Sequence, residues 1–143
     1  MHAMSRRSLL TVAIAAGVLV IGPAYPALAE DVQVMLSGSQ EVPPVTSSGS
    51  GSGMISIRDD KTVSGSVTTT GVTGTMAHIH NGAAGKNGPV VIPLTKTGDN
   101  GWAVPPGAKL TDAQYTAFKA GDHYVNVHSS QHQGGEIRGQ LKP

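Results

Sequence analysis

The sequence predicts an all-β domain, either an antiparallel β-sandwich or a partly open barrel of about eight short strands, with one inserted short helix at about 111–120. Three observations lead to this prediction: short runs in which apolar and polar residues alternate, 19 glycines among 143 residues, and one segment with helix caps. The chain has no cysteine. Packing and strand pairing must therefore hold the domain together without disulfides.

Seven segments of the chain carry strand patterns. Apolar and polar residues alternate along most of them, whereas 90–92 is a continuous apolar run that we expect to be a buried strand. Pro43-Pro44 marks a connection, because proline cannot donate to a strand ladder, and Asp59-Asp60 and Gly134-Gly135 mark turns. In order, the segments are 32–36, 54–58, 61–70, 76–80, 90–92, 124–128 and 136–141.

One segment interrupts the strand pattern with the signals of a short helix. Thr111 is a suitable N-cap, Gln114 completes a capping box, and Leu110 and Tyr115 occupy the positions of a hydrophobic staple. Gly121 is a suitable stop. So short a helix is marginal alone and must pack against the sheet, which predicts three aromatic core residues: Trp102, Tyr115 and Phe118.

Residues 1–29 have the features of a signal peptide. A basic pair precedes an apolar run at 9–21, and Ala27-Leu28-Ala29 fits a signal-peptidase site, so we expect cleavage before Glu30. The basic pair is two arginines, which also fit the twin-arginine route; this stays open beside the general secretory route, and an uncleaved anchor is the alternative. The domain at 30–143 is then periplasmic or secreted, without a stable membrane span.

The net charge of the exported domain limits the classes of partner that we expect it to bind. Removal of the signal peptide leaves 114 residues and takes away two arginines, so the formal net charge falls from +1 to −1. A nearly neutral surface does not favour nucleic acid or an anionic membrane. The expected partners are a metal ion and another extracytoplasmic protein.

Two short segments concentrate the histidines of the domain. In a strand, His78 and His80 project to one face, and Asn126 and His128 share a face in the same way. If the two strands pair or face one another, three imidazoles meet on one surface. Imidazole nitrogens in an oxidising compartment, without thiolates, suit copper first and zinc second.

Several neighbours are candidates for completing such a site. His132, on the turn after His128 at the solvent-accessible mouth of the last hairpin, is a candidate fourth ligand, and Met76 offers a thioether as an accessory ligand. Asn126 is a poor ligand that could instead hydrogen-bond a histidine. His123 is a further accessory candidate, although we expect it to be a surface group.

Two acidic residues are candidates for supporting roles. Glu136, a possible accessory residue, and Glu41 could each orient a liganding imidazole or pair with Arg138. No catalytic set is expected, because Gly49–Gly53 matches a nucleophile-elbow string but has no helix behind it. The alternative to metal binding is a metal-free adhesion or protein-interaction module that presents loops such as 83–88.

Five separated motifs carry a family resemblance: Glu41–Val45, Ala77–His80, Gly88–Val91, Tyr124–His128 and Gly134–Leu141. In this order they resemble the CHRD domain named after chordin, over about 32–141. The resemblance implies a β-sandwich or barrel in an exported protein and implies no defined biochemical activity. The His-x-His strand also resembles the copper-binding strand of Cu/Zn superoxide dismutases. The chain lacks the cysteine and the bridging ligands of those enzymes, so dismutase activity is not expected.

Overall fold

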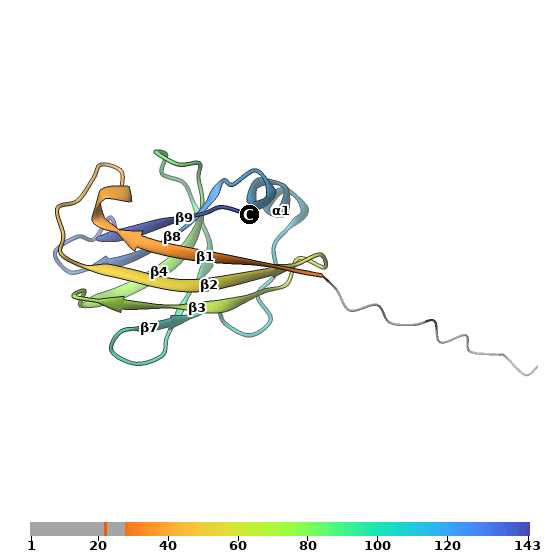
Figure 1. The fold of residues 1–143 in the computed structure, drawn as a ribbon, viewed down its shortest axis with the longest axis horizontal. Helices are drawn as coiled ribbons and strands as arrows, with labels where there is room; N and C mark the ends of the chain where they lie inside the picture. Colours follow the sequence, from red (N-terminus) through yellow and green to blue (C-terminus); the bar gives the residue numbers. More distant parts are fainter. Residues whose placement is uncertain (1–21, 23–27) are drawn as a thin grey trace, which may run out of the picture.

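A computed structural model describes residue 22 and residues 28–143, so the predicted signal peptide lies almost entirely outside the described part. The described part consists of strands, one α-helix and one short 3-10 helix (Figure 1). None of its helices is long and apolar enough to cross a membrane. The elements are β1 (Ala29–Ser37), η1 (Gly38–Gln40), β2 (Ser50–Arg58), β3 (Val63–Thr70), β4 (Gly74–Asn81), β5 (Val90–Pro93), β6 (Thr95–Lys96), β7 (Gly101–Ala103), α1 (Asp112–Lys119), β8 (His123–Ser129) and β9 (Ile137–Leu141).

The strands form one antiparallel sheet that is nearly closed and barrel-like, which confirms the predicted all-β class. The strand order is β5-β4-β8-β9-β1-β2-β3-β7-β6. The two end strands, β5 and β6, follow one another in the chain with only Leu94 between them. The Leu94 N–H donates to the Ala77 carbonyl at 2.9 Å, so the same short segment belongs to both ends of the sheet.

The core follows from the two-residue period of the strands. Along β1, Val32, Val34 and Leu36 are buried while the residues between them are exposed. Ala77 and Ile79 of β4 face the same interior and are each 1% exposed. The polar residues that alternate with them, including the histidines of β4, therefore project to the outer face of the barrel.

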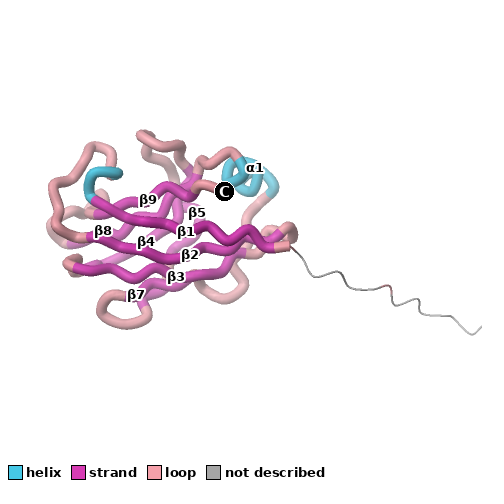
Figure 2. The backbone as a smooth tube through the Cα atoms, in the orientation of Figure 1, coloured by secondary structure: helices cyan, strands magenta, loops and turns pink. Residues whose placement is uncertain are grey.

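Helix α1 begins and ends as its sequence predicts and lies at one end of the barrel (Figure 2). The Gln114 N–H donates to Thr111 Oγ1 at 3.2 Å, and the Thr111 N–H donates to Gln114 Oε1 at 2.8 Å, which is the predicted capping box. Gly121 follows the helix with φ of 80°, a conformation that favours glycine. Phe118 and Trp102 are buried, and Tyr115 packs partly buried against the core, as expected.

The expected buried strand at 90–92 is instead an edge strand. β5 pairs only with β4 at the end of the sheet, and Val90 is 49% exposed, whereas Ile92 is buried. β8 shows the opposite behaviour, because every one of its residues is buried. The loops at 82–89 and 130–135 hydrogen-bond to residues of the outer face around β8, and this covered face holds the candidate site.

Candidate metal centre

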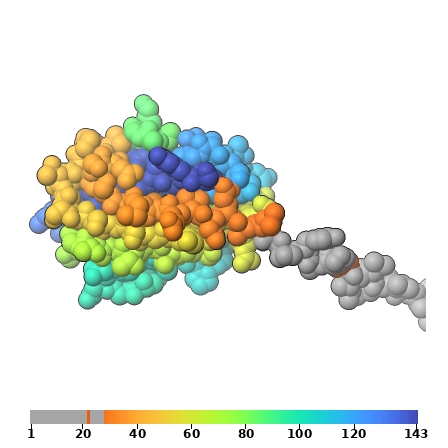
Figure 3. Space-filling view, viewed as in Figure 1, coloured from red at the N-terminus to blue at the C-terminus, as the bar shows by residue number. Residues whose placement is uncertain are grey.

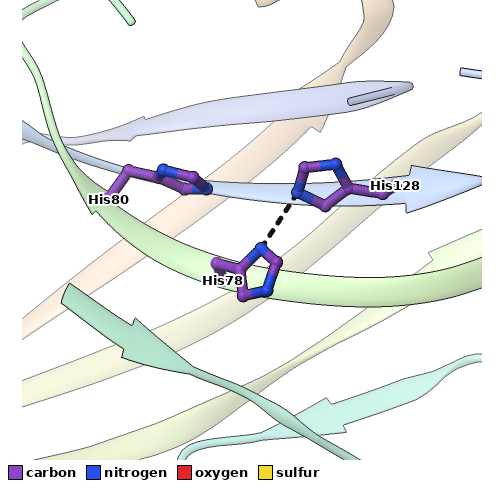
Figure 4. A group of neighbouring side chains, drawn as sticks. All are labelled: His78, His80 and His128. Carbon is purple, nitrogen blue, oxygen red and sulfur yellow. Dashed lines mark hydrogen bonds between the residues drawn. The ribbon is translucent and has the colours of Figure 1, made fainter. Parts of the chain in front are cut away.

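Strand register brings the three predicted histidines together. β4 and β8 are antiparallel neighbours in which His78 lies opposite Asn126, so His128, two residues further along β8, is diagonal to His78 on the same face. Figure 4 shows the three rings gathered over these two strands. The sequence did not show whether these two strands are neighbours. The pairing of β4 with β8 shows that they are.

The three rings each offer a nitrogen, and these nitrogens all lie within 4.8 Å of one another. His78 Nδ1 and His128 Nε2 are 3.0 Å apart, joined by a hydrogen bond. The His80 ring lies 5.4 Å from that of His78, centroid to centroid, and 6.2 Å from that of His128. His78, His80 and His128 are hereafter the histidine trio.

Backbone carbonyls fix the tautomers of two members of the trio. His80 Nδ1 lies 2.9 Å from the Gly88 carbonyl oxygen, and His128 Nδ1 lies 2.8 Å from that of Gln133. A carbonyl can only accept, so both Nδ1 atoms carry the proton and, in a neutral ring, both Nε2 atoms present a lone pair. An imidazole held by its far nitrogen in this way is the usual arrangement of a metal-ligating histidine.

His80 Nε2 is an orphan within the described part of the chain. It is buried, and no hydrogen bond of normal geometry reaches it there, although the Asn126 amide lies beside it. A buried acceptor without a partner destabilises the fold, typically by 1–3 kcal/mol as an order of magnitude, so such atoms are rare in native structures. The unused lone pair of His80 is the feature of the site that a bound cation satisfies directly.

Burial and neighbouring groups favour the neutral forms of His78 and His80. Burial lowers the pKa of His78, and the neighbouring His128 and His80 lower it further. Burial also lowers the pKa of His80; the Gly88 carbonyl opposes this effect and His128 adds to it. Neutral imidazole is the form that binds metal, so a lowered pKa weakens the competition of protons with a cation at His78 and His80.

A three-layer stack that the sequence interpretation missed positions His80. The imidazole lies parallel to the Tyr124 ring at 4.8 Å between centroids, and the Arg138 guanidinium lies 3.4 Å from the centroid of Tyr124. The three residues come from the adjacent strands β4, β8 and β9, with His80 directly opposite Tyr124. Once this register is known, the stack follows from it.

The other expected ligands occupy different surroundings. His132 is half-buried and lies outside the trio, in a depression that it shares with Glu41 and Asn87. Met76 lies opposite His128 in the ladder and is 50% exposed. The predicted solvent-accessible setting does not hold for His128 itself, which is 7% exposed because the 130–135 loop covers it.

The expectation that His123 is a surface group is wrong. His123 has the strand parity of Val125 and Val127, faces the interior and is 0% exposed. Its ring centroid lies 6.2 Å from that of Phe118, so α1 covers it. Neither ring nitrogen has a hydrogen-bond partner within 28–143, and burial lowers its pKa.

Three polar residues that the sequence singles out are buried. Asn126 is 2% exposed and its amide lies next to both His80 and Glu41. Glu41 is likewise buried, whereas Glu136 accepts a hydrogen bond from Ser47 Oγ at 2.7 Å. Neither acid forms an ion pair with Arg138 in the described residues, so that expected alternative does not apply.

The comparison with known families agrees with the family resemblance of the sequence motifs, two of which contain the histidine trio. The family model for the CHRD domain matches residues 32–141, which is most of the chain. The chain belongs to the CHRD domain family. No curated protein and no solved structure matches it significantly. The match extends from within β1 to the end of β9, and the function of the domain is argued from the site itself.

Proposed function

We propose that this CHRD-domain protein is exported and binds one transition-metal ion, copper first and zinc second, through His78, His80 and His128. Metal buffering, delivery or resistance is the corresponding role. The observation that carries the proposal is the buried, unpartnered Nε2 of His80, held toward the other two rings by the Nδ1–H bond to Gly88. A site of three neutral imidazoles is typical of Cu(II) and Zn(II).

The spacing of one nitrogen pair, kept unchanged on metal binding, would suit copper better than zinc. With metal–nitrogen bonds of 2.0–2.1 Å, two nitrogens 3.0 Å apart subtend roughly 90–97° at the metal. This is close to the right angles of tetragonal Cu(II) and smaller than the angle of a tetrahedral zinc site. Water is left to complete the coordination, because His132 lies outside the trio. We propose no turnover at the site.

Copper titration of protein purified after export tests the proposal. We expect about one equivalent of Cu(II) to bind, and free copper at about 100 times Kd to stabilise the fold by roughly 2.7 kcal/mol, which raises the midpoint of a thermal melt. In the double variant His78→Ala/His80→Phe, both effects are expected to disappear. Phenylalanine at 80 keeps an aromatic ring against Tyr124 and removes the ligand nitrogen together with the Nδ1–H bond to Gly88.

His132→Ala is the matched control, because it removes a histidine outside the trio. It is expected to retain one equivalent of copper. Stoichiometric binding that persists in the double variant would overturn the assignment of the ligands. A melting midpoint that copper and chelator leave unchanged would favour the alternative, a metal-free adhesion or protein-interaction module.

The proposed export has a test of its own. Cleavage before Glu30 predicts that the protein recovered outside the cytoplasm begins at Glu30, which N-terminal sequencing or intact mass measures directly. Replacing the Arg6-Arg7 pair by lysines is expected to block export only if the twin-arginine route carries the protein. Full-length protein that stays in the cytoplasm would contradict the localisation.

A further inference from the structure

A second concave site lies apart from the histidine trio. A cleft of about 390 Å³ opens between the segment around 39–44, the loop at 84–85 and the end of β9. These segments meet on one face of the molecule, where the orange-to-yellow and green chain lies beside the blue of β9 (Figure 3). Its volume is within the range of small-molecule sites. Val42, Pro44 and Ala84 give it apolar walls.

A buried cation lines this cleft. Arg138 is 1% exposed, and its Nη2 donates to the Ala83 carbonyl and to Gln140 Oε1, each at 3.1 Å. Nη1 lies 3.4 Å from Asn87 Oδ1. All these acceptors are neutral, and neither of the two ion pairs found among residues 28–143 includes Arg138. Buried arginine is ordinarily paired with an anion, because an unpaired buried charge is costly.

The nearest acid does not supply the missing negative charge in full. Glu41 also lines the cleft, and burial raises its pKa to about 7, against the opposing effect of Arg138. Much of Glu41 is therefore protonated near neutral pH. Lys142 adds a second positive charge to the lining. The cleft thus combines apolar walls with an excess of positive charge.

We propose that this cleft binds a small organic acid, whose carboxylate lies toward Arg138 and Lys142 and whose apolar body packs against Val42, Pro44 and Ala84. Both protons of Nη2 are already donated, so the carboxylate would accept from a remaining N–H group of Arg138 and from the Lys142 ammonium in charge-assisted hydrogen bonds. The partners that Arg138 already has, together with the Tyr124 ring beneath it, hold the guanidinium in place before the acid arrives. The proposal does not rest on metal binding by the trio, although the stack of Arg138, Tyr124 and His80 connects the two sites.

Benzoate and benzamide are the probes for a test by NMR titration of the ¹⁵N-labelled protein. The two have nearly the same shape, and only benzoate carries a charge. We expect benzoate to shift the signals of Gly85, Gln140 and the Arg138 side chain saturably, and benzamide to shift them at least about tenfold less strongly at equal concentration. A short peptide with a free C-terminal carboxylate is the second arm. Whichever carboxylate binds more tightly identifies the source of the acid.

Variants at the rim keep the test valid if substitution of the buried Arg138 impairs folding. Lys142→Gln is expected to weaken benzoate binding about two- to fivefold, whereas Lys86→Gln, a lysine outside the cleft lining, is expected to leave it unchanged. Ala84→Trp is expected to abolish binding by filling the cleft. Equal shifts from benzoate and benzamide, or benzoate binding that survives Ala84→Trp, would overturn the proposal.

Discussion

Replacing Glu41 by glutamine is expected to stabilise the protein at high pH. Glu41 is 5% exposed, and its Oε1 has no hydrogen-bond partner in the described part of the chain. Burial raises its pKa from 4.5 to about 7, and the charge of Arg138 and the amide of Asn126 oppose this only in part. Because the pKa of Glu41 is higher in the folded than in the unfolded state, its protonated form stabilises the fold relative to its ionised form, and this stabilisation is complete below pH 4.5. It is lost as the pH rises through 7.

The size of the effect follows from the two pKa values. At about 1.4 kcal/mol per pH unit, ionising Glu41 costs roughly 3 kcal/mol of unfolding free energy above pH 7. Glutamine has nearly the same shape and no charge to desolvate. Glu41→Gln is therefore expected to raise the free energy of unfolding by roughly 2–3 kcal/mol at pH 8, and by less than about 1 kcal/mol at pH 5.

Urea unfolding at the two pH values, followed by the fluorescence of the single Trp102, measures this difference. Glu136→Gln is the matched control. Burial acts to raise the pKa of Glu136, but hydrogen bonds from Ser129 and Ser47 outweigh it and lower the pKa, so its ionised form stabilises the fold. That variant is expected to gain nothing at pH 8. A Glu41→Gln protein that is less stable than the parent at pH 8 would refute the reasoning, because it would mean that Arg138 holds Glu41 ionised.

Three further substitutions have expected outcomes. His80→Phe keeps an aromatic ring on Tyr124 but removes both the unpartnered Nε2 and the bond from Nδ1 to the Gly88 carbonyl, so the two effects should nearly cancel and leave the metal-free free energy of unfolding within about 1 kcal/mol of the parent, while copper binding is lost; a loss of more than about 2 kcal/mol in urea melts would show that Nε2 has a structural partner. Burial lowers the pKa of His123 in the folded protein, so below about pH 6.5 the unfolded chain binds a proton that the folded protein does not, and stability falls by about 1.4 kcal/mol per pH unit. His123→Leu should remove this loss, and pH-dependent urea melts measure the slope. Thr111→Ala should cost about 1 kcal/mol at any pH, since it removes the helix cap, and Thr111→Ser should restore most of it.

Local patterns in the sequence were sufficient for the helix and for most strands. The capping box of Thr111 and Gln114 lies within four residues, so no distant contact was needed to predict where α1 begins. The closure of the sheet was not predictable in the same way. It depends on β5 and β6 lying at opposite ends of the strand order with only Leu94 between them, and no periodicity encodes that order.

The sequence was sufficient to predict which strand face His78 and His80 share, but not which residues pack against the histidines of the site. Strand alternation placed His78 and His80 on one face correctly, and the same alternation assigns His123 to the face of Val125. A histidine at the start of a strand was nevertheless expected at the surface. That expectation fails because α1, which precedes β8 in the chain, packs over His123 through Phe118.

The contacts that define the chemistry of the site come from loops and register. The Gly88 carbonyl that fixes the tautomer of His80 is eight residues away on the 82–89 loop, and the Tyr124 ring that stacks on it is in another strand. Neither contact has a signal in a single sequence, because both depend on how β4 pairs with β8 and on how the loop folds back over that pair.

Some ring nitrogens of the trio have hydrogen-bond partners within the described residues, and one buried nitrogen does not. This difference connects the stability of the fold to the proposed metal binding. His78 and His128 satisfy one another through their 3.0 Å hydrogen bond, whereas His80 Nε2 remains unpaired at a cost to folding. An apolar ring at this position would keep the stack on Tyr124 but would lose the bond from Nδ1 to the Gly88 carbonyl, so the satisfied and the unpaired nitrogen of His80 come together. In the proposed function, a cation would replace the single hydrogen bond by bonds to all three nitrogens. The part of the site that is unfavourable without metal would then be the part that a metal ion makes favourable.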